Sequence, residues 1–149
     1  MKKLSRAILV LAISMLAAGC ASGPKFSEVS PSLSKLSPDS GRIFIYRTAV
    51  LGAAVQPDIR LNGGVVGSAV PQGFFYLDRA PGNYEIETST EVDRKLSFIL
   101  EKGQTRYVRL NISMGFFVGH VYPELVENRE GEAEIQECSY TGSEAVKKF

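Results

Sequence analysis

Short stretches of alternating polarity, separated by turn signals, are the feature that most restricts how this chain can fold. In residues 57–61 apolar and charged side chains alternate, as they do in a strand with one buried face. Residues 62–64 are Asn-Gly-Gly, and these residue types tolerate the positive φ that tight hairpin turns need. Residues 65–70 are mostly apolar again, so the sequence predicts a β-hairpin here.

The same kind of pattern continues along residues 41–142. Residues 42–47 are apolar on both faces, as expected of a central strand, whereas residues 84–88 and 106–114 alternate. Aliphatic residues, Thr, Tyr and Phe are plentiful, which favours strands over helices. The expected fold is therefore all-β, an antiparallel β-sandwich of about seven to nine strands in a single domain.

The pattern changes after the predicted sandwich strands. Residues 128–138 suit a short helix in which Asn128 could cap the N-terminal end, although Gly131 weakens this prediction. We favour a short C-terminal helix over a further strand. The side chains expected to face the core are Ala133, Ile135 and Cys138. Residues 143–149 are expected to form a frayed tail.

The N-terminus has the composition of an export signal. Residues 1–6 contain three basic side chains, and residues 7–18 form an apolar stretch shorter than the roughly 20 residues of a membrane-spanning helix. The residues that resemble the lipobox of bacterial lipoproteins are Leu16, Ala17, Ala18, Gly19 and Cys20. The resemblance implies that residues 1–19 are a signal peptide cleaved before Cys20 and that the Cys20 thiol receives a diacylglyceryl group. The alternative is an ordinary secretory signal followed by an accidental cysteine.

Lipidation at Cys20 would make the membrane a partner of this protein, held through two or three acyl chains, palmitate among them. By resemblance to the envelope lipoproteins of Gram-negative bacteria, Ala21 in place of Asp implies the outer membrane, facing the periplasm. Residues 20–40 are rich in Ser, Pro, Gly and Lys and are expected to form a flexible tether. The alternative is that a part around residues 29–36 packs against the domain.

The charge balance argues against a nucleic-acid partner. The 149 residues carry a formal net charge of +1, and three of the basic residues leave with the predicted signal peptide. The remaining chain is slightly acidic, and it lacks the strongly basic composition with which proteins bind phosphate backbones.

Four short segments follow one another in a recognisable order: 41–47 (GRIFIYR), 61–67 (LNGGVVG), 80–84 (APGNY) and 131–138 (GEAEIQEC). This order resembles a domain-of-unknown-function family of small bacterial lipoproteins. The two middle segments also look like parts of PEGA-type and transthyretin-like β-sandwiches, in which a Pro-Gly-x-Tyr turn ends a strand. The resemblance implies a β-sandwich fold, and it supplies neither an activity nor functional residues.

The residues that could carry catalysis lack the neighbours that catalysis needs. His120 has no nucleophile or carboxylate near it in the sequence, so we interpret it as a structural or surface residue. Glu85 and Glu87 share one strand face, where alternation alone explains them. The sequence contains no phosphate-binding loop, dinucleotide fingerprint or metal-ligand spacing. We therefore expect no enzymatic activity, no cofactor and no metal.

Cys138 would be the single free thiol of the chain once Cys20 carries lipid. It could not then form an internal disulfide, and it is either buried and inert or available to a partner. We favour burial, because free cysteine is among the most buried residue types.

Two aromatic doublets, at residues 74–75 and 116–117, are the most suggestive feature for function. Successive side chains of a strand point to opposite faces, so one ring of each doublet can lie outside the core and form an apolar patch. The alternative is that strand bulges or the tail cover these rings. The candidate interaction surface consists of Phe75, Phe117, His120 and Tyr122.

These observations favour a membrane-anchored envelope lipoprotein that acts as a protein-interaction or structural module. The alternative is a module that binds glycan or peptidoglycan fragments, which the PEGA-like resemblance implies. An exposed aromatic platform flanked by polar groups would favour glycan binding, and a flat apolar patch would favour protein binding. An enzyme would require His120 to lie beside carboxylates in a concave pocket.

Overall fold

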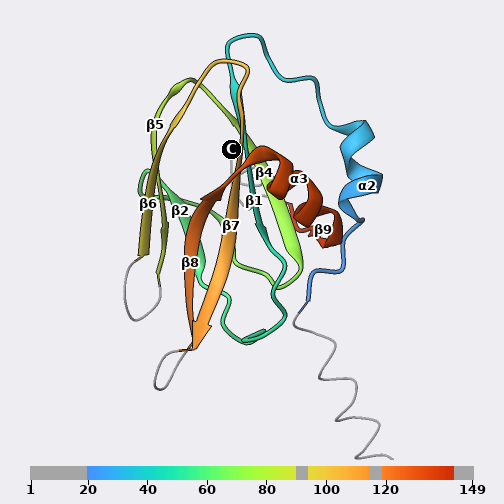
Figure 1. The fold of residues 1–149 in the computed structure, drawn as a ribbon, viewed down its shortest axis with the longest axis vertical. Coiled ribbons are helices and arrows are strands. Elements are labelled where there is room, and N and C mark those ends of the chain that lie inside the picture. The colour runs from blue at the N-terminus through green and yellow to red at the C-terminus, as the bar shows by residue number, and fades with distance from the viewer. Residues whose placement is uncertain (1–19, 90–93, 115–118, 143–149) are drawn as a thin grey trace, which may run out of the picture.

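The computed structural model describes residues 20–89, 94–114 and 119–142, without the side chain of Met114. Two β-sheets pack face to face, and two helical segments cover the outer face of one of them (Figure 1). The described strands number nine, and most neighbours run antiparallel. The predicted all-β sandwich is therefore confirmed, with two parallel pairings, β1–β7 and β4–β9, added to it.

One sheet has five strands in the order β8-β7-β1-β4-β9, and the other has four in the order β3-β2-β5-β6. The strands of the five-stranded sheet are β1 Gly41–Arg47, β4 Gly73–Arg79, β7 Thr105–Met114, β8 Gly119–Val126 and β9 Ser139–Tyr140. The strands of the four-stranded sheet are β2 Asp58–Leu61, β3 Gly64–Ser68, β5 Gly82–Thr88 and β6 Arg94–Leu100.

The core between the two sheets is built from the inward-facing side chains of both. Ile45 of β1 lies opposite Phe75 in β4 and Val108 in β7, and all three are buried. From the other sheet, Ile59 and Ile86 complete the same apolar cluster. Burial of this apolar area is the main favourable contribution to folding, at about 25 cal/mol per Å².

A second buried cluster lies on the opposite face of the five-stranded sheet. It is covered by α2 Phe26–Val29, α3 Asn128–Glu134 and the 3₁₀ turn η2 Ile135–Glu137. The 3₁₀ turn η1 Ser30–Ser32 follows α2 and has no buried residue. Because both faces of β1 are covered, all seven of its residues are buried, as the apolar pattern of residues 42–47 predicts. The buried members are Phe26, Phe44, Tyr46, Phe74, Tyr107, Val126, Ile135 and Cys138.

The predicted short C-terminal helix is present as α3 and η2, but its details differ. Glu127 occupies the N-cap position without a side-chain hydrogen bond, and Asn128 is already helical, so the predicted Asn128 cap is wrong. Ala133 is exposed, whereas Ile135 and Cys138 are fully buried as expected. The reason is geometric: Gly131, rather than Ala133, faces the sheet, where it packs against Tyr107.

Much of the segment predicted to be a tether is folded against the domain. The backbone N–H of Phe26 donates to the carbonyl of Cys138 (3.1 Å), and that of Tyr140 donates to Pro24 (2.8 Å). The Phe26 ring makes edge contacts with Phe44 and Phe74, with centroids 5.6 and 5.3 Å away. The alternative, in which part of residues 20–40 packs against the domain, is therefore the arrangement observed. The packing begins before the expected residues 29–36, with Pro24 and Phe26.

The Asn-Gly turn forms the predicted hairpin between β2 and β3. Asn62 and Gly63 have φ values of 48° and 83°, in the left-handed region that these residue types tolerate best. The returning strand is shorter than predicted and ends at Ser68. Within the described ranges, the helices are too short to cross a membrane.

Candidate functional site

The aromatic surface predicted around Phe75 does not form. Phe75 is only 2 % exposed and lies in the core between the sheets, while its neighbour Phe74 is fully buried in the second cluster. Both faces of β4 are covered, by the other sheet on one side and by α2 and the C-terminal segment on the other, so the tail-cover alternative holds for this doublet. Phe117 falls outside the described residues.

His120 and Tyr122 lie on β8 and are both half-buried. Nδ1 of His120 is buried and has no hydrogen-bond partner in the described part of the chain, so this histidine has no positioned acid or base partner there. Tyr122 borders a depression beside the start of β6. The other residues lining this depression are Arg94, Lys95, Ser113 and Pro123.

The densest cluster of charge surrounds Arg109 in β7. Its guanidinium contacts Glu124 of β8 (2.9 Å) and Glu130 and Glu134 of α3 (2.7 Å each). The hydroxyl of Tyr46 donates to Glu134 at 2.6 Å. Sequence analysis did not single out Arg109, because its partners come from elements far apart in the chain. These ion pairs connect α3 to the five-stranded sheet, and each of the three carboxylates contacts Arg109.

The pKa shifts of this cluster follow from its hydrogen bonds. The bonds from Arg109 and then Asn111 hold the pKa of Glu124 below its usual value. Burial, followed by the bond to Glu134, raises the pKa of Tyr46 far above that of a free tyrosine. These directions keep Glu124 charged and Tyr46 neutral at pH 7, which suits a structural ion-pair network.

The two carboxylates weighed as an acid–base pair contact a lysine instead. Lys95 lies 2.9 Å from Glu85 and 3.4 Å from Glu87 on the outer face of the four-stranded sheet. Cys138 is fully buried, as expected, and burial raises the pKa of its thiol to about 12. Among the described residues, no group of three or more His, Cys, Asp or Glu side chains could hold a metal ion.

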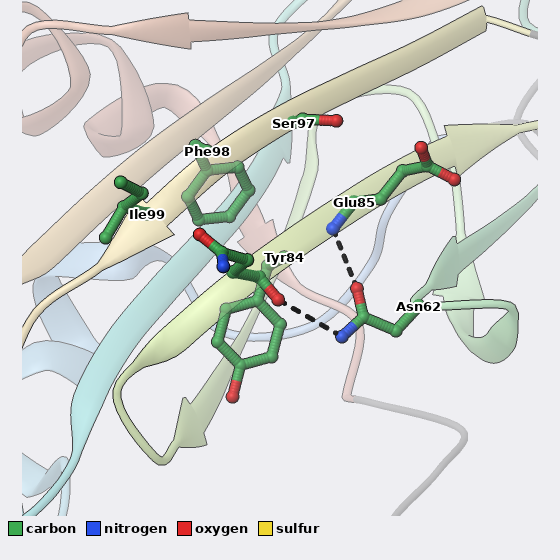
Figure 2. A pocket seen from close by; sticks show the side chains of 7 residues that line it. Asn62, Tyr84, Glu85, Ser97, Phe98 and Ile99 are labelled. Atoms are coloured by element: carbon green, nitrogen blue, oxygen red, sulfur yellow. Dashed lines mark hydrogen bonds between the residues drawn. The ribbon is translucent and has the colours of Figure 1, made fainter.

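A shallow depression of about 340 Å³ lies over β5 and β6, next to the β2–β3 turn (Figure 2). Asn62 fixes its wall: the side-chain oxygen accepts from the backbone N–H of Glu85 (2.7 Å), and the amide donates to the carbonyl of Asn83 (3.4 Å). Ile99 stands exposed at its edge. The lining residues are Asn62, Asn83, Tyr84, Glu85, Ser97, Phe98 and Ile99.

Arg47, the last residue of β1, is buried and organises the connection between β1 and β2. Each of its five N–H groups donates to a backbone carbonyl, at 2.8–3.1 Å. Sequence analysis missed this role, although Arg47 ends an apolar strand and is followed by ten uncharged residues, 48–57. The five acceptors are the carbonyls of Ala49, Leu51, Gly52, Val55 and Ala69.

The predicted lipidation site lies at this same end. The backbone N–H of Ala21, directly after Cys20, donates to the carbonyl of Pro71 at 2.9 Å. Figure 1 shows the first described residues and the β1–β2 connection together at the lower end of the molecule. The remaining lipobox residues, 16–19, fall outside the described residues.

Comparison with known proteins identifies the family. The model described as "Protein of unknown function (DUF2846)" matches residues 37–121, more than half of the chain. An uncharacterised protein of Haemophilus influenzae is 28 % identical over 143 residues, covering 93 % of this chain and 85 % of that relative. No solved structure matches significantly, so the PEGA-like and transthyretin-like likeness stays a prediction. The expectation of a domain-of-unknown-function family is confirmed, and the chain belongs to the DUF2846 family.

Proposed function

We propose that this protein is a lipoprotein of the bacterial envelope that is anchored through Cys20 and works by binding another envelope protein, without catalysis. The observation that carries the proposal is the position of Cys20. It follows an apolar leader with a lipobox-like end, and the chain is hydrogen-bonded to the domain from the next residue, Ala21, onward.

The docking of Ala21 gives the anchor a mechanical consequence. A free tether of about 20 residues would let the domain move on the order of 25 Å from the membrane. With Ala21 bonded to Pro71, acyl chains on Cys20 would hold the domain directly against the bilayer. This arrangement suits a protein that presents a surface at a defined height.

A binding role is supported by the state of the ionisable groups. The carboxylates around Arg109 are engaged in ion pairs, Cys138 is buried, and His120 lacks a hydrogen-bond partner at Nδ1 within the described ranges. Catalytic acids, bases and nucleophiles need a reachable position and an orienting neighbour. The carboxylates, the thiol and the imidazole named above each lack a reachable position or an orienting neighbour.

We assign to the partner the depression over β5 and β6 that Asn62 and Ile99 border. Ile99 of the edge strand β6 is 58 % exposed there. Its carbonyl already accepts from the Arg106 side chain (3.2 Å), so we expect the partner to contact the apolar Ile99 side chain. Glycan binding is less well supported, because two polar groups that line this depression already bond within the protein. The Asn62 amide bonds to β5, and the Tyr84 hydroxyl donates to the carbonyl of Ala80 (2.7 Å).

The anchor is tested by metabolic labelling with a palmitate analogue. The wild-type chain should be labelled and recovered in the membrane fraction, and a Cys20→Ala variant should lose both properties. An unlabelled wild-type chain, or a labelled Cys20→Ala variant, would refute anchoring at this residue.

The binding surface is tested by placing a photocrosslinking amino acid at position 99 in intact cells. Position 132, which is exposed on α3, serves as the control. The proposal expects an envelope protein that is crosslinked from position 99 and not from position 132. Identical products from both positions, or no product from position 99, would contradict it.

A further inference from the structure

The connection between β1 and β2, residues 48–57, exposes apolar side chains at its tip. Val50 is 48 % exposed and Leu51 is 60 % exposed, and they are two of the four large apolar residues that the described part of the chain exposes. None of residues 48–57 carries a charge. Exposed apolar side chains in an uncharged loop commonly mark a contact surface.

This loop has a fixed conformation, because Arg47 binds it from within. The buried guanidinium donates to four carbonyls of the loop, and Val55 N–H donates to the Gly52 carbonyl (2.9 Å). Gly52 has a φ of 69° and lies so close to β7 that a side chain there would overlap Ile112. The network holds the backbone in place while Val50 and Leu51 point to solvent.

The same network reaches the residue that we propose to be lipidated. Arg47 also donates to the carbonyl of Ala69 (2.8 Å), and two residues later Pro71 accepts the bond from Ala21. The first described residues and the loop therefore share one end of the molecule, as Figure 1 shows.

We propose that residues 48–57 are a membrane-contact loop, in which Val50 and Leu51 enter the interface of the bilayer beside the lipidated Cys20. The proposal rests on the proposed lipid anchor. Apolar side chains partition into the headgroup–acyl boundary. The lipid on Cys20, at the same end of the molecule, already holds the loop at the bilayer surface. Insertion of Val50 and Leu51 is then an intramolecular step, for which two apolar side chains are enough to orient the domain.

This orientation would direct the proposed partner surface away from the membrane. Arg47 ends β1 near the bilayer, and Gly41 at the other end of β1 pairs with Arg79. Gly82, where β5 begins, follows three residues later, and the depression around Asn83 and Ile99 lies at that far end. The loop and the depression are thus at opposite ends of the sandwich.

The absence of tryptophan from the whole sequence gives a clean test. A Leu51→Trp variant of the full-length lipidated protein is reconstituted into vesicles of phosphatidylethanolamine and phosphatidylglycerol that contain brominated phosphatidylcholine. Ile99→Trp is the matched control, since Ile99 is similarly exposed at the far end. Val50→Trp is a second reporter in the loop. Flotation with the vesicles and the mass of the lipid on Cys20 are measured on the same samples.

The proposal expects brominated lipid to quench the tryptophan of Leu51→Trp several-fold more than that of Ile99→Trp, and aqueous iodide to show the reverse order. Suppose that the protein carries lipid and floats, but both loop variants respond to iodide as the Ile99→Trp control does. That result would overturn the membrane-contact loop and leave the anchor standing. Shielding of the loop variants from both quenchers would indicate contact with a second protein copy and would also overturn it. A chain without lipid on Cys20 would overturn both proposals.

Discussion

Gly131 of α3 packs directly onto Tyr107 of β7, so that a Cβ atom on Gly131 would overlap the Cβ and Cγ atoms of Tyr107. This contact sets how closely the C-terminal helix approaches the five-stranded sheet. It also explains a glycine within a helix, where it is less favourable than Ala by about 1 kcal/mol.

A Gly131→Ala substitution is expected to destabilise the protein by about 1–3 kcal/mol, because overpacking outweighs the gain in helix propensity. Urea unfolding of the full chain measures the change. The control is Ala133→Gly at an exposed position of the same helix, which should cost no more than about 1 kcal/mol. An increase in stability for Gly131→Ala would show that the helix can move away from Tyr107 without loss.

The sequence predicted the elements whose pattern is local. Residues 42–47, apolar on both faces, became the central strand β1, and the Asn-Gly turn formed as expected. The sequence offered docking only as an alternative for residues 29–36, and it did not indicate that the main contact is a single ring further upstream, Phe26. Its burial depends on Phe44 and Phe74, which lie on strands that the sequence cannot place relative to it.

A Phe26→Ala substitution is expected to lower the free energy of unfolding by about 3 kcal/mol, because it leaves a cavity in the second cluster. Residues 20–36 should become sensitive to limited proteolysis at the same time. Leu36→Ala, in the same segment and outside this cluster, is the control and should leave the proteolysis pattern unchanged. Unchanged protection in Phe26→Ala would mean that the segment is held by its backbone bonds alone.

The role of Arg47 was also invisible in the sequence, for a different reason. Its acceptors are backbone carbonyls, and carbonyls have no residue-type signature. Likewise, exposure and burial of Phe75 both remained open in the sequence, because alternation shows only that the two rings of a doublet diverge. It does not show that β4 is covered on both faces.

Replacing Arg47 by Lys keeps the charge and removes at least two of the five donors, and replacing it by Met removes all five. The bond to Ala69 is buried and the other four are partly buried. A buried carbonyl left without a donor costs about 1–3 kcal/mol, so both variants should be destabilised by about that amount. Amide hydrogen exchange in residues 48–57 should accelerate. Arg60→Met, at a half-buried arginine of β2, is the control, and equal exchange in all three variants would contradict the proposed role.

Cys138 gives a pH dependence on the alkaline side. Its thiol pKa rises from 9.0 to about 12 on folding, mainly through burial, so the folded state holds this proton more tightly than the unfolded state. The stabilisation is complete below pH 9 and is lost as the pH rises toward 12, at up to about 1.4 kcal/mol per pH unit.

Because buried tyrosines titrate in the same range, the measurement compares unfolding of the wild-type chain with that of Cys138→Ala across this window. The difference in stability between the two should shrink as the pH rises. A constant difference from pH 8 to 11 would show that the thiol ionises as freely in the folded state as in the unfolded state.

Glu124 gives a dependence of opposite sign on the acid side. Hydrogen bonds from Arg109 and Asn111 lower its pKa in the folded state, so its contribution is present above the unfolded pKa near 4.5 and is lost as the pH falls below it. Glu124 is nearly half exposed, so solvent screening limits the effect to about 0–1 kcal/mol.

The test compares acid-side unfolding of the wild-type chain with that of Glu124→Gln and Glu132→Gln. Glu132 makes no ion pair within the described residues, so its variant should follow the wild-type curve. Glu124→Gln should be less stable than the wild type at pH 7, and the two should converge near pH 3. If the gap persisted at pH 3, Glu124 would act through packing instead of charge, and the ion pair with Arg109 would contribute nothing to holding β7 and β8 together.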